Sequence, residues 1–325
     1  MENRKIAVLD LGTNTFNLII SSLDHSNKIT QVYRDRIAVK IGQGGINQQL
    51  ITPEAQQRAI LAVQDFKDTI DKFGVKEITA IATSAFRNAT NGFELAQKIK
   101  TFTGIDIKII DGNHEAELIY YGVKLALDIG EEPALVMDVG GGSVEFIIGN
   151  NNEIFWKQSF EIGAQRLLEK FHKTDPIPAD SIVDLNNYLD EKLVDLLTAV
   201  KVFQPKVLIG SSGAFDTLTE IEFAKQNVPI SIEERAEFEL YYDLFLEIYN
   251  ELISKNKEER KLIKGMIEMR VDMIVVAAIL IKFVKDQCEI GKIRVSTYSL
   301  KEGVLYNFLN PMQIKNSAYR NQMEA

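Results

Sequence analysis

Short apolar runs alternate with amphipathic stretches along the first part of the chain. Apolar runs bounded by glycine or turn residues are typical of buried strands. The chain has such runs at 6–10, 16–22, 28–41, 77–83 and 105–110. About five turn residues separate the first two runs, which predicts a hairpin.

Between these strands, apolar residues recur at the spacing of amphipathic helices. A Thr-Pro-Glu sequence at 52–54 predicts a helix start, and Gly74 predicts its end, because hydroxyl caps, early prolines and terminal glycines favour these positions. Two further helices are predicted over 92–102 and 114–127. The order of these elements predicts an α/β layer with a mixed sheet.

The opening pattern then recurs. Asp10 and Asp138, 128 positions apart, each end an apolar strand, and at the same offset Gly12 matches Gly140 and Thr15 matches Ser143. A strand, an Asp-x-Gly turn and a second apolar strand therefore occur twice. This repetition predicts an internal duplication of a half-domain.

The same alternation of apolar strand patterns and amphipathic helix patterns continues through the rest of the chain. Strands are predicted over 134–138, 144–148, 153–160, 206–209 and 292–297, and helices from about 163, over 180–202, from 213, and over 232–254, 266–286 and 300–308. We expect two α/β domains, at 1–125 and 126–312, followed by a tail at 313–325.

Composition narrows the function classes. The chain has 37 Lys and Arg against 46 Asp and Glu, a formal charge of −9, which disfavours a nucleic-acid polymer as partner. A single cysteine, Cys288, and three histidines disfavour a disulfide framework or a zinc site. The apolar run at 274–281 is too short to span a bilayer, so we expect a cytoplasmic protein without a membrane partner.

The two matching turns, 10–15 and 138–143, are the strongest chemical signal. Turns of Gly, Ser and Thr can gather backbone N–H and hydroxyl donors into an anion-binding concavity. An adjacent aspartate can hold Mg²⁺, which then bridges to phosphate oxygens. Two tight hairpins with Asx turns are the structural alternative. Facing copies across a cleft would clamp a polyphosphate.

Three further features are open to two interpretations each. The run at 210–213 joins a strand to a helix start and is either a ligand loop or a packing turn. Arg87 follows the end of a strand and either grips a phosphate or forms a surface salt bridge. Glu115 begins a helix and either compensates the helix dipole or acts as a general base on water.

Taken together, these residues resemble the exopolyphosphatase / guanosine pentaphosphate phosphohydrolase family of the actin-like superfamily. The resemblance rests on seven short sequences in a fixed order, at 9–15, 82–87, 112–116, 138–145, 163–167, 210–213 and 301–303. It implies an α/β fold with two ribonuclease-H-like (actin-like) domains, each with a mixed sheet, flanking a cleft. It also implies a homodimer and Mg²⁺-dependent hydrolysis of a terminal phosphoanhydride.

The resemblance assigns roles residue by residue. It makes Glu115 the catalytic group that activates water, and Asp138 and Glu145 the acids that hold the metal, to which we add Asp10 as a further candidate. Phosphate-binding residues are predicted in the three turns and at the arginine: Gly12, Thr13, Asn14, Thr15, Arg87, Gly140, Gly141, Gly142, Ser143, Gly210, Ser211, Ser212 and Gly213. Cations that could line the cleft are Arg34, Arg36, Lys40 and Arg166.

The predicted function is hydrolysis of the terminal phosphoanhydride of inorganic polyphosphate or guanosine pentaphosphate. The alternative is a non-catalytic or slow sensor of guanosine tetra- or pentaphosphate. The alternative is motivated by His114, which stands where the family usually has a second acid. The family's late Arg-Glu-Gly is also changed here, to Lys301-Glu302-Gly303. A lysine at this position cannot bind an anion bidentately.

Overall fold

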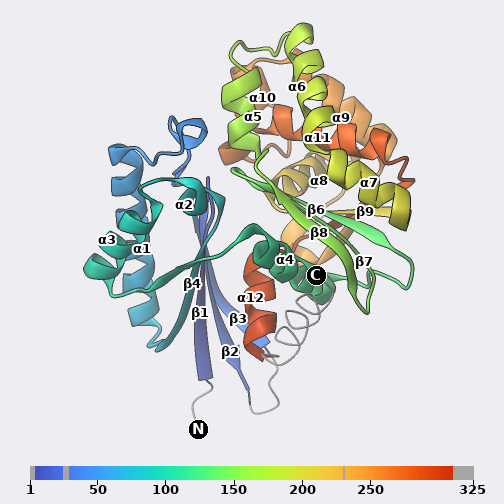
Figure 1. The fold of residues 1–325 in the computed structure, drawn as a ribbon. Helices are drawn as coiled ribbons and strands as arrows, with labels where there is room; N and C mark the ends of the chain where they lie inside the picture. The colour runs from blue at the N-terminus through green and yellow to red at the C-terminus, as the bar shows by residue number, and fades with distance from the viewer. Residues whose placement is uncertain (1–3, 25–28, 230, 310–325) are drawn as a thin grey trace.

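Two mixed sheets form the framework of the molecule (Figure 1). The computed structural model describes residues 4–24, 29–229 and 231–309. The strands of the first sheet are β1 (Arg4–Leu11), β2 (Phe16–Leu23), β3 (Ile29–Ile37), β4 (Glu77–Ala82) and β5 (Ile107–Ile109). Those of the second are β6 (Ala134–Val139), β7 (Val144–Gly149), β8 (Ile154–Phe160), β9 (Val207–Ser211), β10 (Glu237–Leu240) and β11 (Lys292–Ser296).

The two sheets share one topology. The first has the order β3-β2-β1-β4-β5, and this order recurs in the second as β8-β7-β6-β9-β11, with β10 added at the edge. In each sheet the first three strands are antiparallel and the next two are parallel. Asp10 pairs with Asn17 in one hairpin, and Asp138 pairs with Glu145 in the other. The α/β fold with two mixed sheets is confirmed, and the topology supports the predicted duplication.

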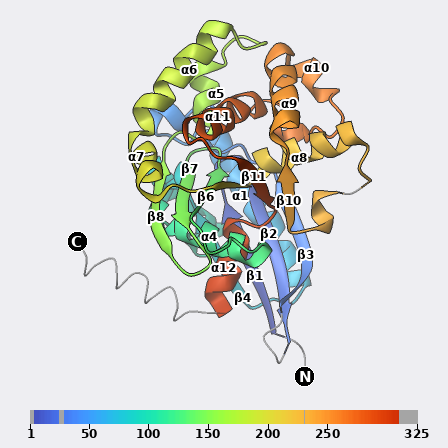
Figure 2. The same ribbon diagram turned by 90° about the vertical axis from the view of Figure 1, so that its right-hand side faces the viewer.

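Helices cover both sheets on their outer faces and also lie between them. The helices are α1 (Pro53–Lys72), α2 (Ser84–Asn88), α3 (Gly92–Thr103), α4 (Gly112–Ala126), α5 (Ala164–Phe171), α6 (Ala179–Lys192), α7 (Val194–Phe203), α8 (Gly213–Gln226), α9 (Tyr242–Ser254), α10 (Lys257–Lys261), α11 (Ile274–Gln287) and α12 (Leu300–Leu309). Short 3-10 helices lie at Ile46–Gln48, Ile232–Glu234 and Glu268–Arg270. Figure 2 shows α5, α6 and α9 to α11 gathered at one end, away from the first sheet.

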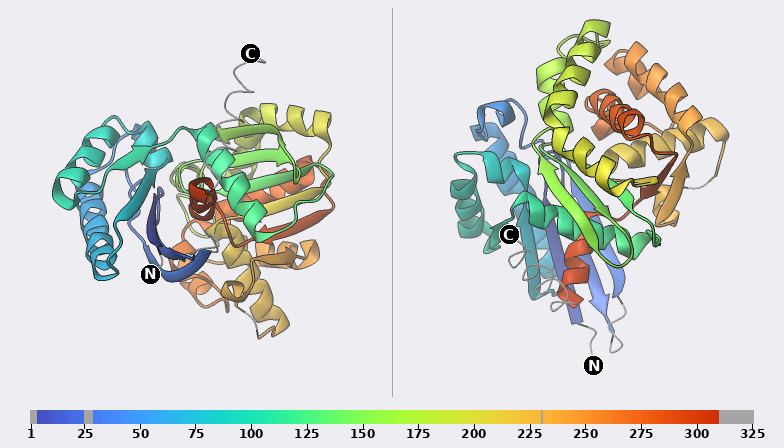
Figure 3. Two further views of the ribbon diagram at one scale, coloured as in Figure 1. Left: turned by 90° about the horizontal axis from the view of Figure 1, so that it is seen from below. Right: turned by 45° about the vertical axis from the view of Figure 1, so that its right-hand side comes forward.

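Helices α4 and α12 fill the space between the sheets (Figure 3). Their apolar side chains join a core with Ile6 and Val8 of β1 and Val136 of β6. The two helices cross closely because glycine lies at the contact on each of them. A Cβ on Gly122 would lie 1.9 Å from the Ser299 carbonyl oxygen, and a Cβ on Gly303 would lie 1.7 Å from that of Leu118.

Most predicted elements are confirmed, and the errors have local causes. The start of α1 is as predicted, since Thr52 Oγ1 accepts a hydrogen bond from the Ala55 N–H at 3.3 Å. The predicted helix at 180–202 is two helices, because the chain leaves helical geometry at Leu193. The first part of the predicted helix at 232–254 is not helical. It includes the edge strand β10, which forms by pairing with β11, and helix α9 begins only at Tyr242.

Other differences lie in short or irregular segments. The predicted helix at 266–286 begins as a 3-10 turn and becomes α-helical only at Ile274. Helices α2 and α10, of five residues each, carry too few turns for periodicity to show. In the part of the chain that the structure describes, none of the helices is long and apolar enough to cross a membrane. The domain limits at 1–125 and 126–312 stay a prediction, and the tail at 313–325 lies outside the described residues.

Candidate functional site

The two hairpin turns meet at one polar cavity of about 80 Å³. Helix α4 contributes Glu115 and Ile119, which lie one helical turn apart and therefore share a face. Ser212 and Ser299 border the cavity just before α8 and α12. The predicted residues that line it are Asp10, Gly12, Thr13, Asn14, Thr15, Glu115, Asp138, Gly140, Gly141, Gly142, Ser143 and Ser212.

The second turn is held so that its N–H groups face the cavity. The carbonyl groups of Gly140, Gly141 and Gly142 accept hydrogen bonds from the first N–H groups of the α5 region, at 2.9, 2.8 and 3.2 Å. In a trans peptide the next N–H points away from the carbonyl. The donors that follow these carbonyls are therefore directed away from α5, which makes an anion-binding concavity.

The first turn uses the same arrangement with a different partner. The loop after β3 donates the Gly42 N–H to the Thr13 carbonyl at 3.2 Å and the Lys40 N–H to the Asn14 carbonyl at 2.8 Å. The N–H groups of Asn14 and Thr15 consequently point to the opposite side. Both turns thus direct backbone donors toward one space.

Two helix N-termini add to the positive potential. Helix α8 begins after Ser212 and α12 after Ser299, and both residues line the cavity. Unpaired N–H groups and the helix dipole favour an anion at such positions. Ser212 has φ of 76° and ψ of 171°, a conformation that strongly favours glycine. This strained residue lies at the cavity, where backbone strain is often found.

Asp10 and Asp138 both line this cavity, Asp138 as a buried acid and Asp10 as a half-buried one. Burial raises the pKa of each carboxyl group to about 6, and the charge of Asp138 contributes to the increase at Asp10. The Lys301 ammonium, itself buried, opposes the increase at both. Ser211 Oγ donates a 2.6 Å hydrogen bond to Asp138, and Asn17 donates one of 3.0 Å to Asp10.

Glu115 lies on the first turn of α4 and is 6% exposed. Burial and the charge of Glu145 raise its pKa well above the ordinary range, whereas Arg87 lowers it. Arg87 Nη1 donates to Glu115 Oε2 at 2.9 Å and to the Ile110 carbonyl at 3.1 Å. Arg87 does not line the cavity, so the structure places it behind Glu115, at the edge of a second, open cavity.

Glu145 is almost fully buried next to Asp138 and accepts a 2.6 Å hydrogen bond from Ser159. Burial and the Asp138 charge raise its pKa to about 8. Glu145 itself does not line the cavity, whereas Asp10, Glu115 and Asp138 do, and such a group of neighbouring acids suits a hard cation. Within the described residues, no three acidic, histidine or cysteine side chains are arranged to hold a metal ion by themselves. Mg²⁺ needs only one or two carboxylates when substrate phosphates and water complete its shell.

The four residues of the third predicted turn, 210–213, have different roles: the two glycines make room for packing, and the two serines contact the site. A Cβ on Gly210 would lie 2.2 Å from the Phe215 ring, and one on Gly213 would lie 2.2 Å from the Arg270 guanidinium. These glycines make room for other side chains, and neither lines the cavity. Ser211 acts on Asp138, and Ser212 alone of the four residues borders the cavity.

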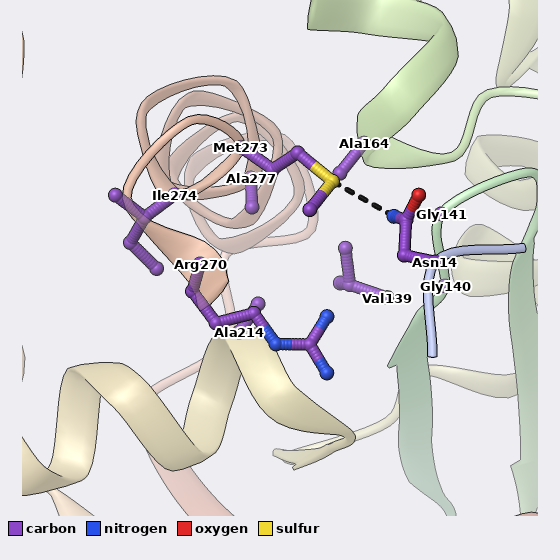
Figure 4. Close-up of a pocket in the computed structure, with 10 residues that line it drawn as sticks. All are labelled: Asn14, Val139, Gly140, Gly141, Ala164, Ala214, Arg270, Met273, Ile274 and Ala277. Carbon is purple, nitrogen blue, oxygen red and sulfur yellow. Dashed lines mark hydrogen bonds between the residues drawn. The ribbon is translucent and has the colours of Figure 1, made fainter. Parts of the chain in front are cut away.

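Sequence reasoning missed six of the described residues that line the cavity: Asn17, Thr83, Ile119, Arg270, Ser299 and Leu300. Arg270 is the charged residue among them. Figure 4 shows its guanidinium directed toward the turns that carry Asn14 and Gly140, beside an apolar recess. Its Nε is buried without a partner, and burial lowers its pKa to about 10. The recess holds about 10 Å³, room for one water molecule at most, and Asn14 Nδ2 reaches Met273 Sδ across it at 2.8 Å.

The four predicted cleft cations do not line the cavity among the described residues. Arg36 contacts Asn17 at 3.3 Å, Lys40 pairs with Asp272 at 3.4 Å, and Arg166 donates to the Gly142 carbonyl at 2.7 Å. The Arg34 charge acts on Asp216. Lys40 and Arg166 donate to the backbone of the first and second turns, at Asn14 and Gly142. His114 also lies outside the cavity, and its N–H is capped by Asp111 at 2.9 Å.

A model of the Ppx/GppA phosphatase family matches residues 18–311. A bifunctional 3-dehydroquinate synthase/phosphatase from Fusobacterium nucleatum is 30% identical over 293 residues, which are 86% of this chain and 43% of that protein. Exopolyphosphatase 2 from Mycobacterium tuberculosis is 25% identical over 315 residues, 92% of this chain and 97% of that protein. The chain therefore spans less than half of the first relative and nearly all of the second.

Solved structures agree with these matches. The crystal structure of an exopolyphosphatase from Cytophaga hutchinsonii is 44% identical, with a TM-score of 0.92 over 95% of this chain and 98% of that one. An Aquifex aeolicus member of the Ppx/GppA protein family is 24% identical, with a TM-score of 0.77 over 95% of this chain and 98% of that one. The second likeness supports the fold alone.

Proposed function

Because the chain belongs to the Ppx/GppA phosphatase family, we propose that it hydrolyses the terminal phosphoanhydride of inorganic polyphosphate or guanosine pentaphosphate. The observation that carries the proposal is the meeting of both glycine turns and Glu115 at one polar cavity. Terminal phosphoryl transfer to water depends on positioning and charge stabilisation more than on covalent chemistry. Backbone donors, two helix N-termini and Arg270 meet these requirements.

Glu115 is the proposed general base. It lies buried at the cavity wall, and an ionised carboxylate there can orient a water molecule and accept its proton. Arg87 restrains the carboxylate from behind and favours its ionised form, since its charge lowers the Glu115 pKa. The opposing effect of burial keeps that pKa high enough for the group to be an effective base.

Asp138 and Glu145 are the residues that we propose to hold Mg²⁺, with Asp10 as a further candidate. Their raised pKa values arise from burial and mutual repulsion, and a divalent cation would relieve that repulsion. Mg²⁺ at such a site neutralises negative charge on the phosphate oxygens. The two turns then orient the phosphate chain with its end toward Glu115.

The test is Glu115→Gln, assayed for phosphate release from polyphosphate and guanosine pentaphosphate side by side. We expect release to be lost and calorimetric binding of polyphosphate to be retained, because the amide keeps the shape but accepts no proton. Glu117→Gln is the matched control, since Glu117 is equally buried on α4 but pairs with Lys157 at 2.8 Å and does not line the cavity.

Each outcome of this test is informative. Full phosphate release by Glu115→Gln would reject the assignment of the base. Tight binding of the guanosine nucleotide by the wild type without turnover, at millimolar Mg²⁺, would favour the sensor. Chelation of Mg²⁺ should abolish release, and its return should restore it. Light scattering tests the homodimer that we propose for this family member.

A further inference from the structure

Glu161 joins the two halves of the molecule next to the proposed catalytic group. It follows β8 of the second sheet, and its Oε2 accepts hydrogen bonds from Ser84 Oγ at 2.6 Å and from Arg166 Nη2 at 3.0 Å. Its Oε1 accepts one from Arg87 Nη2 at 3.2 Å. Ser84 and Arg87 belong to α2, which follows β4 of the first sheet. We call these four side chains the clasp.

Arg166 extends the clasp to the second glycine turn. Its Nε donates to the Gly142 carbonyl at 2.7 Å, and its Nη1 donates to the Ile46 carbonyl at 2.9 Å, in the other half of the molecule. Glycine also lets Ser84 come close to this turn, because a Cβ on Gly142 would lie 2.5 Å from Ser84 Oγ. The turn that presents N–H groups to the cavity is therefore fixed from behind by the clasp.

Arg87 is held between two carboxylates. Nη1 meets Glu115 Oε2 at 2.9 Å, and Nη2 meets Glu161 Oε1 at 3.2 Å. Because the guanidinium is planar, fixing one nitrogen sets the direction in which the other meets its partner. The Glu161 side chain is 39% exposed, and such pairs contribute little to stability. Glu161 therefore matters more for the orientation of the Arg87 side chain than for the stability of the fold.

We propose that Glu161 is a positioning residue, which closes the clasp between the two halves and orients Arg87 so that Glu115 faces the cavity. This inference rests on the proposed function and extends it to a residue that does not line the cavity. Without the Glu161 charge, Arg87 Nη1 keeps its bonds to Glu115 and the Ile110 carbonyl, but the charged partner of Nη2 is lost.

The test is Glu161→Gln, assayed for kcat and KM on polyphosphate. The glutamine side chain keeps one oxygen that can accept a hydrogen bond from Ser84 or an arginine, but it carries no negative charge. We expect kcat to fall about tenfold, a loss typical of a displaced catalytic group, with KM no higher than in the wild type. KM should not rise, because the variant has one negative charge fewer beside a proposed anion site.

Glu169→Gln is the matched control. Glu169 also bridges the halves, since it accepts from the Gly44 N–H at 2.9 Å and from Asn47 Nδ2 at 3.3 Å, but it has no bond to Arg87. We expect this variant to keep kcat within about twofold. Equal kcat losses in both variants, or unchanged kcat in Glu161→Gln, would overturn the proposal.

A second measurement separates this inference from the proposed function. If the wild type releases no phosphate from either substrate, the proposed function is rejected, but the role of the clasp can still be tested. Hydrogen exchange then reports on the Gly163, Ala164 and Gln165 amides, which bond to the carbonyls of the second turn. Faster exchange at these amides in Glu161→Gln than in Glu169→Gln supports the clasp, and equal exchange overturns it.

Discussion

Replacing Gly303 by alanine tests the close crossing of α4 and α12. The new Cβ would lie 1.7 Å from the Leu118 carbonyl oxygen, whereas real Cβ atoms essentially never approach within 3.0 Å. The helices must separate by at least the difference, 1.3 Å, and the obstacle is backbone, so no rotamer change relieves it. Overpacking of this kind costs about 3 kcal/mol of unfolding free energy.

The same displacement should reach the cavity. Ser299 and Leu300, at the start of α12, line it, and a misplacement of about 1 Å can cost on the order of 100-fold in rate. We therefore expect Gly303→Ala to lower both the urea midpoint and the rate of phosphate release.

Gly291→Ala is the control, because a Cβ there has no neighbour within 4 Å and the backbone is not left-handed. Urea unfolding followed by circular dichroism, together with phosphate release below the transition, gives both quantities. A Gly303→Ala protein with the midpoint and rate of the wild type would refute the reasoning.

Two further changes probe strain and buried charge. Ser212→Gly should raise the unfolding free energy by about 1 kcal/mol, because glycine adopts φ of 76° and ψ of 171° without strain; an unchanged urea midpoint would contradict this. Burial raises the pKa of Glu222 to about 7, so the folded state binds its proton more tightly and stability falls as pH rises toward that value. Glu222→Gln removes this dependence, and its urea midpoint relative to wild type should rise between about pH 5 and pH 8; a constant difference would count against it.

The sequence alone predicts the features that depend on neighbours in the chain. The turns at Asp10 and Asp138 are visible because strand, glycine turn and strand follow one another directly. Glu115 could be placed because α4 begins at a clear cap, where Asp111 accepts the His114 N–H. The burial of Glu115 could not be predicted in this way, because α4 lies between the sheets and is buried on all sides from Glu115 to Val123.

Features that depend on distant contacts could not be predicted. Arg270 follows a methionine-rich stretch that is typical of a core helix, and only the 3-10 turn at 268–270 directs it to the cavity. Gly210 has the sequence context of a ligand loop, but the Phe215 ring occupies the space that a side chain would need. Strand β10 pairs with residues 53 to 59 positions away, and Glu161 of the clasp meets Ser84, 77 positions away.

The position of α12 has a consequence for how the nascent chain folds. Residues 300–309 cover Ile6 and Val8 of the first strand and pack on α4, so the earliest-made sheet lacks part of its inner cover until they emerge from the ribosome. Domains usually fold one after another during synthesis. Here the last described helix completes the core between the sheets and one wall of the polar cavity together, so a half-made chain would lack both.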